Sequence, residues 1–214
     1  VTLSLDEVVT GYWWMAAGMA IGSIVGVVGA RKVKMTAMPQ MVALFNGMGG
    51  ATAALVSVAE FLRLTGLGES IGAGESTSIV LGTAIGAISF TGSIIAFGKL
   101  QEILPGKPLQ FPLQRVVNGL ILLAVIGLGA MVVASGGTST LWALFAAALL
   151  LGAMFVLPIG GGDMPVVISI LNSLTGLAAA LTGFVLHNQM LVVAGVLVGA
   201  SGTLLTLLMS TAMN

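Results

Sequence analysis

Two asparagines occupy matching places in two apolar segments, and an amide in such a segment needs a chemical explanation. Asn46 follows Met38-Pro39, and Asn172 follows Met164-Pro165 at the same spacing. A glycine and then an Ala-Ala-Leu sequence follow each asparagine. A polar side chain inside a membrane segment is costly unless it has polar partners or lines a wet path. The duplication therefore indicates either hydrogen bonding between helices or a water-lined path between two related halves.

A carboxylate lies just before the second of these segments. Asp163 follows three glycines and precedes Met164-Pro165, a pattern that predicts a tight turn and then a helix start. Aspartate is a preferred N-cap residue, and proline suits the first helical turn. Alternatively, Asp163 is a partly desolvated carboxylate at the mouth of the path, where it could exchange protons. Both interpretations remain open at this point.

Two other titratable residues are weaker candidates. Glu60 lies on the same helical face as Asn46, at the end of an apolar run, and is either an outer proton port or an interface carboxylate. His187 is the single histidine, a residue suited to proton transfer near neutral pH. It lies beside Asn188 and Gln189, so a solvated loop side chain is the simpler interpretation.

The chemistry of soluble enzymes is missing from the sequence. It has no phosphate-binding loop and no glycine fingerprint in a strand–helix unit. No His, Asp and Glu residues have metal-ligand spacing, and no basic face favours nucleic acid. We therefore expect no catalytic, cofactor-binding or metal-binding residues in these 214 residues, and no nucleic-acid partner.

Composition predicts the elements that must position these side chains. The 214 residues are 57% hydrophobic and 7% charged, with a mean hydropathy of +1.15, whereas a soluble domain is roughly 25% charged. The charge-free runs are uniformly apolar rather than alternating, which favours spanning helices over a β-barrel. We predict an all-α polytopic membrane protein whose residues 1–214 form a single transmembrane domain. The seven predicted spans are 9–30, 38–60, 78–98, 116–134, 140–159, 164–186 and 190–212.

Two further patterns predict topology. Six of the seven basic residues fall on one side of the predicted spans, and Arg63 falls on the other. Because positive loops stay cytoplasmic, the N-terminus is predicted outside and Asn214 inside. Gly82 and Gly86 in the third span match Gly195 and Gly199 in the seventh. Together with the two asparagine segments, they predict a parallel repeat of spans one to three and five to seven, joined by the fourth.

Three sequence motifs, in order, carry a resemblance to a known family. They are residues 34–43 with Asn46-Gly47, residues 89–100 and residues 161–167 with Asn172. Over nearly its whole length, the sequence resembles the membrane domain of the β subunit of proton-translocating nicotinamide nucleotide transhydrogenase.

The resemblance implies a function and roles for four residues. In the family, hydride passes between NADH and NADP⁺ in soluble domains, and proton flow through the membrane domain drives NADPH formation. Ser93, Asn172 and Asp163 match polar positions implicated in proton passage or in its coupling to NADP(H) binding. Asn46 falls where many members carry a histidine. An amide cannot carry a proton as imidazole does, so either a partner subunit supplies the titrating group or water held by Asn46 conducts.

The resemblance also implies partners and a location. These are the α-subunit membrane helices, an NADP(H)-binding domain on the cytoplasmic side, a dimer of the complex and the bacterial cytoplasmic membrane. In the family that domain follows the membrane helices, and further spans precede the first one here. We therefore expect this sequence to be a fragment or shortened form that binds neither NAD(H) nor NADP(H) and transfers no hydride alone.

Two other functions fit the residues without the resemblance. One is a secondary transporter or channel for a small solute or cation, because repeated halves with paired asparagines suit such a site. The other is a passive membrane scaffold in which every small-residue face serves helix packing. Composition and periodicity do not separate these alternatives from proton translocation.

Overall fold

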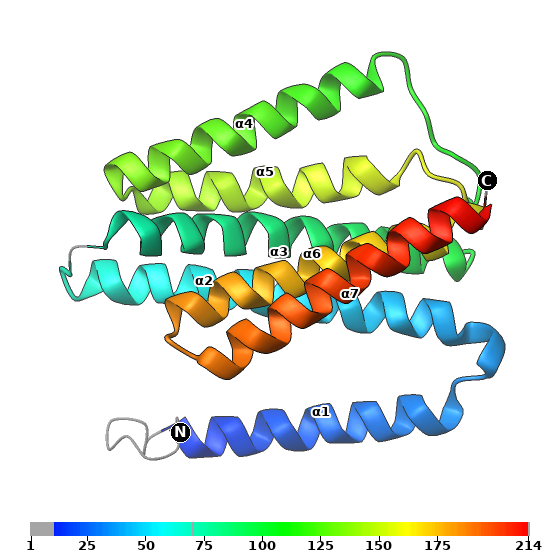
Figure 1. The fold of residues 1–214 in the computed structure, drawn as a ribbon, viewed down its shortest axis with the longest axis horizontal. Helices are drawn as coiled ribbons and strands as arrows, with labels where there is room; N and C mark the ends of the chain where they lie inside the picture. Colours follow the sequence, from blue (N-terminus) through cyan, green and yellow to red (C-terminus); the bar gives the residue numbers. More distant parts are fainter. Residues whose placement is uncertain (1–10, 70, 214) are drawn as a thin grey trace.

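Seven long helices run back and forth across the molecule (Figure 1). The computed structural model describes residues 11–69 and 71–213, and all regular elements in these ranges are helical. Each of the seven is long and apolar enough to cross a membrane, which confirms the predicted all-α multi-pass fold. The predicted start of the first span, at residue 9, lies outside the described residues. The helices are α1 (Tyr12–Lys32), α2 (Met38–Gly66), α3 (Ala73–Leu100), α4 (Gln114–Ser135), α5 (Thr138–Val156), α6 (Met164–Val185) and α7 (Gln189–Met213), with single 3₁₀ turns η3 (Met35–Ala37) and η4 (Gly161–Asp163).

The helix ends differ from the predicted spans where charge or proline intervenes. Helix α2 continues to Gly66 and α3 begins at Ala73, so both extend beyond the charge-free runs used to predict them. A charge-free run marks only the segment that can lie in the hydrocarbon core of the membrane, and the helix itself can continue into the polar headgroup region. Helix α5 ends at Val156 rather than at 159. Pro158 explains this end, because proline has no N–H and disfavours helical geometry in the residue before it.

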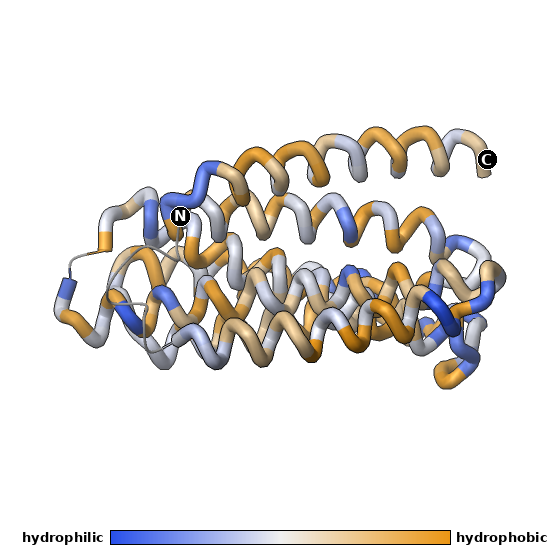
Figure 2. The backbone as a smooth tube through the Cα atoms, turned by 90° about the horizontal axis from the view of Figure 1, so that it is seen from below, coloured by the Kyte–Doolittle hydropathy of each residue, from blue (hydrophilic) through white to orange (hydrophobic). Residues whose placement is uncertain are grey.

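One end of the bundle collects positive charge, and we call it the basic end. Helices α1, α3, α5 and α7 end there, and α2, α4 and α6 begin there (Figure 1). Figure 2 shows most of the hydrophilic segments at the two ends of the bundle and mainly apolar residues along the helices. The basic residues at this end are Arg31, Lys32, Lys34, Lys99, Lys107 and Arg115.

Helix α3 is the most buried of the seven and packs against α2, α4, α5 and α6. Two apolar clusters surround it. One includes Phe61, Ile79 and Leu144 and lies away from the basic end. The other includes Met164 and Leu171 and lies toward that end. The polar layer described below occupies the space between these two clusters along α2, α3 and α6.

Glycines bring two antiparallel helix pairs into backbone contact. A Cβ atom added at Gly50 of α2 would lie 2.8 Å from the carbonyl oxygen of Gly86 in α3. A Cβ added at Gly176 of α6 would lie 2.9 Å from the carbonyl oxygen of Gly195 in α7. The α2/α3 and α6/α7 pairs therefore both use glycines for close approach, with the matching Gly50 and Gly176 on one side, but Gly195 is the counterpart of Gly82 and not of Gly86, so α7 packs one turn out of the register of α3. The full three-helix repeat stays a prediction.

Helix α1 stands apart from the other six (Figure 1). None of its side chains is buried, and its residues Gly18, Gly22 and Gly26 have no atoms within 4 Å of an added Cβ. Near its end, Gly29 approaches Met41 of α2. The packing that positions polar side chains therefore comes from α2 to α7.

Candidate functional site

Asn46 lies at the contact between α2 and α3. Its side chain is buried, with 8% exposed. Its Nδ2 donates to Ser93 Oγ at 2.9 Å and, with a longer distance of 3.4 Å, to Ser89 Oγ. Gly47 permits this approach, since a Cβ there would lie 3.2 Å from the Cβ of Ser93. The structure thus joins two residues that the sequence predicted for the pathway, Asn46 and Ser93.

Ser89 extends this group to a third helix, α6. Its Oγ lies 2.9 Å from the carbonyl oxygen of Leu171 and 2.5 Å from Thr175 Oγ1. Thr175 Oγ1 in turn donates to the Leu171 carbonyl at 3.0 Å. We call Asn46, Ser89, Ser93 and Thr175 the amide cluster. Its chain of exchangeable hydrogens crosses the α2–α3–α6 junction between the two apolar clusters.

One atom of the amide cluster lacks a partner. The Oδ1 atom of Asn46 is buried, and no donor in the described part of the chain reaches it. Leaving a buried acceptor unsatisfied costs roughly 1–3 kcal/mol. A donor from outside the described residues that reached this carbonyl oxygen would therefore stabilise the cluster.

A second, smaller polar contact joins α2 and α6 farther from the basic end. Ser57 Oγ lies 3.2 Å from Thr182 Oγ1, and both side chains are buried. Thr182 also donates to the carbonyls of Ala53 and Ala178. These hydroxyls continue the line of polar groups from the amide cluster along the same helix junction.

Asn172 does not join the amide cluster. Its side chain is half-buried, and it has no hydrogen-bond partner within residues 11–69 and 71–213. Its chain neighbour Leu171 belongs to the cluster's hydrogen bonds through its carbonyl, whereas Ser173 donates to the Gly199 carbonyl of α7 at 2.8 Å. Asn172 therefore lies on α6 between the face toward α3 and the face toward α7. The structure brings Asn46 and Ser93 together and leaves Asn172 without a bond to either.

The pathway residues predicted from the sequence included neither Ser89 nor Thr175. The sixth span was interpreted through its small-residue face, which contains Asn172 and Gly176. Thr175 is four residues after Leu171, so it lies one turn farther on the face toward α3. The sequence signal for Thr175 was its spacing of four residues from Leu171, which places both side chains on the same face of the helix.

The carboxylates lie at opposite ends of the bundle. Asp163 is exposed at the basic end and directly precedes α6, but its side chain makes no capping hydrogen bond. Asp163 therefore occupies the predicted N-cap position, but its side chain does not cap the helix, and its role at the mouth of the path stays a prediction. Glu60 lies toward the other end and forms a bidentate ion pair with Arg63, at 2.6 and 3.0 Å.

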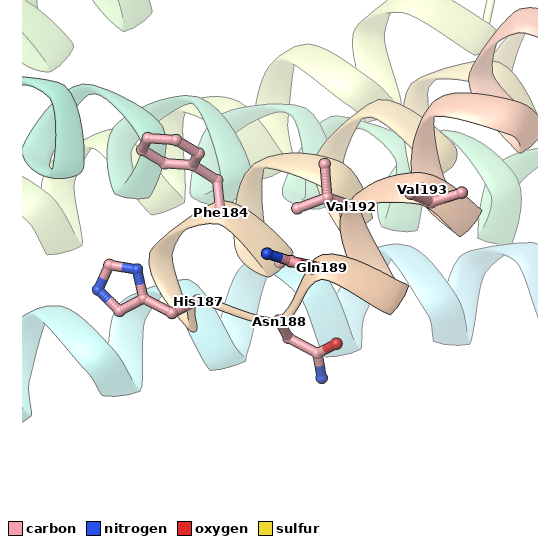
Figure 3. Close-up of a pocket in the computed structure, with 7 residues that line it drawn as sticks. Phe184, His187, Asn188, Gln189, Val192 and Val193 are labelled. Atoms are coloured by element: carbon pink, nitrogen blue, oxygen red, sulfur yellow. The ribbon is translucent and has the colours of Figure 1, made fainter. Parts of the chain in front are cut away.

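His187 lies in the turn between α6 and α7, far along α6 from the amide cluster. Its side chain is exposed and extends away from the turn, beside a shallow hollow that Phe184 and Gln189 also line (Figure 3). This placement matches the predicted solvated loop histidine. Among the described residues, no three His, Asp or Glu side chains group closely enough to hold a metal ion.

These features define a helical multi-pass membrane protein with a polar layer at a three-helix junction. The sequence model of the family described as NAD(P) transhydrogenase beta subunit matches residues 1–214. A protein named NAD(P) transhydrogenase subunit beta, from Rhodospirillum rubrum, is 44% identical over 217 aligned residues, which cover 100% of this chain and 47% of that relative. A sequence of the same name from a defined strain of the species matches equally well. The chain belongs to the NAD(P) transhydrogenase β-subunit family and spans about half the length of these relatives.

Proposed function

We propose that this chain is the proton-translocating membrane part of an NAD(P) transhydrogenase. In the complete enzyme it couples transmembrane proton flow to hydride transfer between NADH and NADP⁺. NAD(H) and NADP(H) bind elsewhere in the complex and not to these helices. The single observation that carries the proposal is the amide cluster, a buried hydrogen-bonded group at the α2–α3–α6 junction with one free acceptor.

The amide cluster conducts by relaying hydrogen bonds rather than by holding a charge. Ser89 and Thr175 are hydrogen-bonded to each other and can exchange a proton, because hydroxyls both donate and accept, whereas Ser93 meets them only through the Asn46 NH₂ group, so a water molecule must bridge that step. The Asn46 amide does not titrate, and the free Oδ1 is where a proton carrier contacts the chain. That carrier is a water molecule or a titrating side chain on an α-subunit membrane helix. Asn172, half-buried beside the cluster, is a second contact point for the same partner.

The charges at the two ends of the bundle indicate how the chain is oriented in the membrane. With positive loops on the cytoplasmic side, the basic end faces the cytoplasm and α1 begins outside, in the bacterial cytoplasmic membrane. Asp163 then faces the cytoplasm, where the NADP(H)-binding domain docks. Coupling between proton and nucleotide sites is reciprocal, so nucleotide state must change the proton affinity of the carrier that contacts the cluster. The complex works as a homodimer, and the exposed surface of α1 remains free for other subunits.

Replacing Asn46 in the complete enzyme tests this proposal. Proton translocation and NADP(H) binding are measured in sealed vesicles for Asn46→Leu and Asn46→His. Leu removes both the donor and the free acceptor, so we expect translocation to fall at least about tenfold, within the usual range of coupling effects. His places a titratable group at the junction and is expected to keep translocation while adding a dependence on pH near neutrality.

Thr52→Val is the matched control for these variants. Thr52 lies on α2, is exposed and bonds only to the Met48 carbonyl of its own helix. Its loss should leave translocation unchanged. Parental proton pumping in Asn46→Leu would reject the role of the amide cluster and, with it, the proposed function of this chain.

A further inference from the structure

A buried lysine at the basic end takes no part in the amide cluster. Lys99 lies near the end of α3, and only 2% of it is exposed. Its ammonium group donates to the carbonyl oxygens of Leu157 and, at 2.8 Å, of Ile159. The described residues contain no carboxylate in an ion pair with it, because the only ion pair there joins Arg63 and Glu60.

The carbonyls that Lys99 binds lie at the end of α5. Leu157 is the residue after the helix, where carbonyls lack intrahelical partners and the helix dipole is negative. Pro158 follows directly and cannot donate an N–H to this region. A buried ammonium group is costly unless it is fully hydrogen-bonded. Two of the three N–H groups of Lys99 bond to the end of α5, and they lose these acceptors if that end moves.

The same turn is bonded to the loop between α3 and α4. The N–H of Leu109 donates to the Leu157 carbonyl at 3.2 Å, so this oxygen receives both Leu109 and Lys99. The N–H of Gly161 donates to the Gly106 carbonyl at 2.9 Å. Residues 157–163 thus form a fixed turn, which we call the coupling turn. Asp163 is its last residue.

The end of α3 also holds the start of α2. Gln40 donates its Nε2–H to the carbonyl of Leu100, the residue next to Lys99, at 3.1 Å. Gln40 lies on the helix that carries Asn46. Through two adjacent residues, the end of α3 therefore bonds to α2 on one side and to the coupling turn on the other.

We infer that Lys99 is a positioning residue that fixes the coupling turn relative to α2 and α3. A shift of α2 or α3 at the amide cluster then moves Leu157 and the turn that ends in Asp163. This role rests on the proposed function, because it gives the path between the proton-conducting junction and the docked nucleotide domain. Lys99 itself does not carry the proton.

A single labelled cysteine reports the position of the turn. Residues 1–214 contain no cysteine, and Gly162 has no atoms within 4 Å of an added Cβ, so Gly162→Cys places an accessible thiol in the coupling turn, and any cysteine elsewhere in the complete enzyme is first replaced by serine. The complete enzyme with this thiol is combined with Lys99→Met, which keeps an apolar stem and removes the donors. Lys107→Met is the control, since Lys107 is an exposed cation in the neighbouring loop.

Two readouts separate positioning from simple folding. With Lys99→Met we expect the rate of maleimide labelling at residue 162 to rise about tenfold, and the NADP(H) affinity to lose its response to the proton gradient by a factor in the usual 5–150-fold range of coupling. With Lys107→Met both should match the parent. Parental labelling in Lys99→Met would overturn the inference. Faster labelling with unchanged coupling would overturn it as well, because the turn would then move without consequence.

Gln40→Met keeps the inference testable if Lys99→Met does not assemble. It removes the bond to Leu100 from the side of α2, and we expect smaller changes in the same direction. Unchanged labelling in this variant would overturn the inference. The labelling readout needs no proton transfer, so it stands or fails independently of the Asn46→Leu result that tests the proposed function.

Discussion

The α2/α3 and α6/α7 helix pairs pack in a similar way, but their asparagines differ in hydrogen bonding. Both are antiparallel, and glycines hold both in backbone contact, Gly50 with Gly86 and Gly176 with Gly195. In the first pair, the asparagine is buried and bonded to the opposite helix. In the second pair, Asn172 is half-buried and has no partner among the described residues.

The contacts across the two helix pairs explain this difference. Gly47 of α2 meets Ser93 of α3, whereas its counterpart Ser173 of α6 meets Gly202 of α7, and Ala43 of α2 matches Ser169 of α6. Gly202 offers no hydroxyl, and Thr206 donates to Ser169 Oγ at 3.0 Å instead of meeting the amide. A duplicated residue therefore need not keep a duplicated role. The residues on the opposite helix decide whether the asparagine side chain is hydrogen-bonded within the pair or is available to another partner.

The glycine contacts are expected to give the largest effects and to be equal in the two pairs. In Gly86→Ala the new Cβ would lie 2.7 Å from the Gly50 carbonyl oxygen, and in Gly195→Ala it would meet the backbone N–H of Ala180. Such overpacking costs about 1–3 kcal/mol, because backbone atoms must move. Thermal unfolding of the detergent-solubilised protein should show a lower Tm for both.

Gly22→Ala is the control for that comparison. Gly22 lies on α1 with no atoms within 4 Å of an added Cβ, so its Tm should not fall. If only one of the two contact glycines proves sensitive, the helix pairs do not share the same packing.

The asparagines should differ in stability although they match in sequence. Asn46→Leu removes donation to Ser93 and Ser89, and a hydrogen bond between membrane helices contributes on average about 0.6 kcal/mol, with a maximum near 1.7. We expect a loss of about 1 kcal/mol. Asn172→Leu removes no bond seen here and should change stability by less than about 0.5 kcal/mol. Denaturant titration in mixed micelles measures both, and equal losses would show that Asn172 has a buried partner.

The seven helices could be predicted because lipid imposes a simple requirement. Each charge-free run is long enough to span, and the sequence misplaced mainly the helix ends near Glu60 and Arg63, near Glu75 and near Pro158. The pairing of Asn46 with Ser93 follows from two small-residue faces and could be expected once the second and third spans are taken as neighbours.

Other parts of the site depend on contacts that spacing does not reveal. The bond between Ser169 and Thr206 competes for the hydroxyl that Asn172 would need, and only the register of α6 against α7 decides this competition. Lys99 counts as a loop-flanking basic residue in the sequence, yet the fold buries it against the end of α5. Long-range pairings of this kind require the packed helices.

Ser169→Ala should make the α6/α7 helix pair resemble the α2/α3 pair more closely. Alanine is the residue at the matching position 43, and its introduction frees Thr206 from its bond to Ser169. The substitution also removes donation from Ser169 Oγ to the Gly202 carbonyl at 3.2 Å, so two membrane hydrogen bonds are lost and we expect a loss of about 1 kcal/mol. If the freed hydroxyl turns to Asn172, then Asn172→Leu becomes costlier in the Ser169→Ala background than in the parent. A double-mutant cycle measures this coupling, and strict additivity would show that Asn172 points away from α7.

Glu60 gives the smallest expected effect, and it tests the ends of the matched helices. Its counterpart on α6 is Leu186, so only α2 carries a carboxylate at this level. Both oxygens of Glu60 are held by Arg63, whose side chain is largely exposed. Exposed pairs of this spacing add little stability, so Glu60→Gln should leave the Tm unchanged within error. A carboxylate occupied on both oxygens is also a poor proton port, so proton translocation in vesicles should match the parent. A clear fall in translocation with an unchanged Tm would instead place the outer mouth of the path on α2, at an end where α6 offers only leucine.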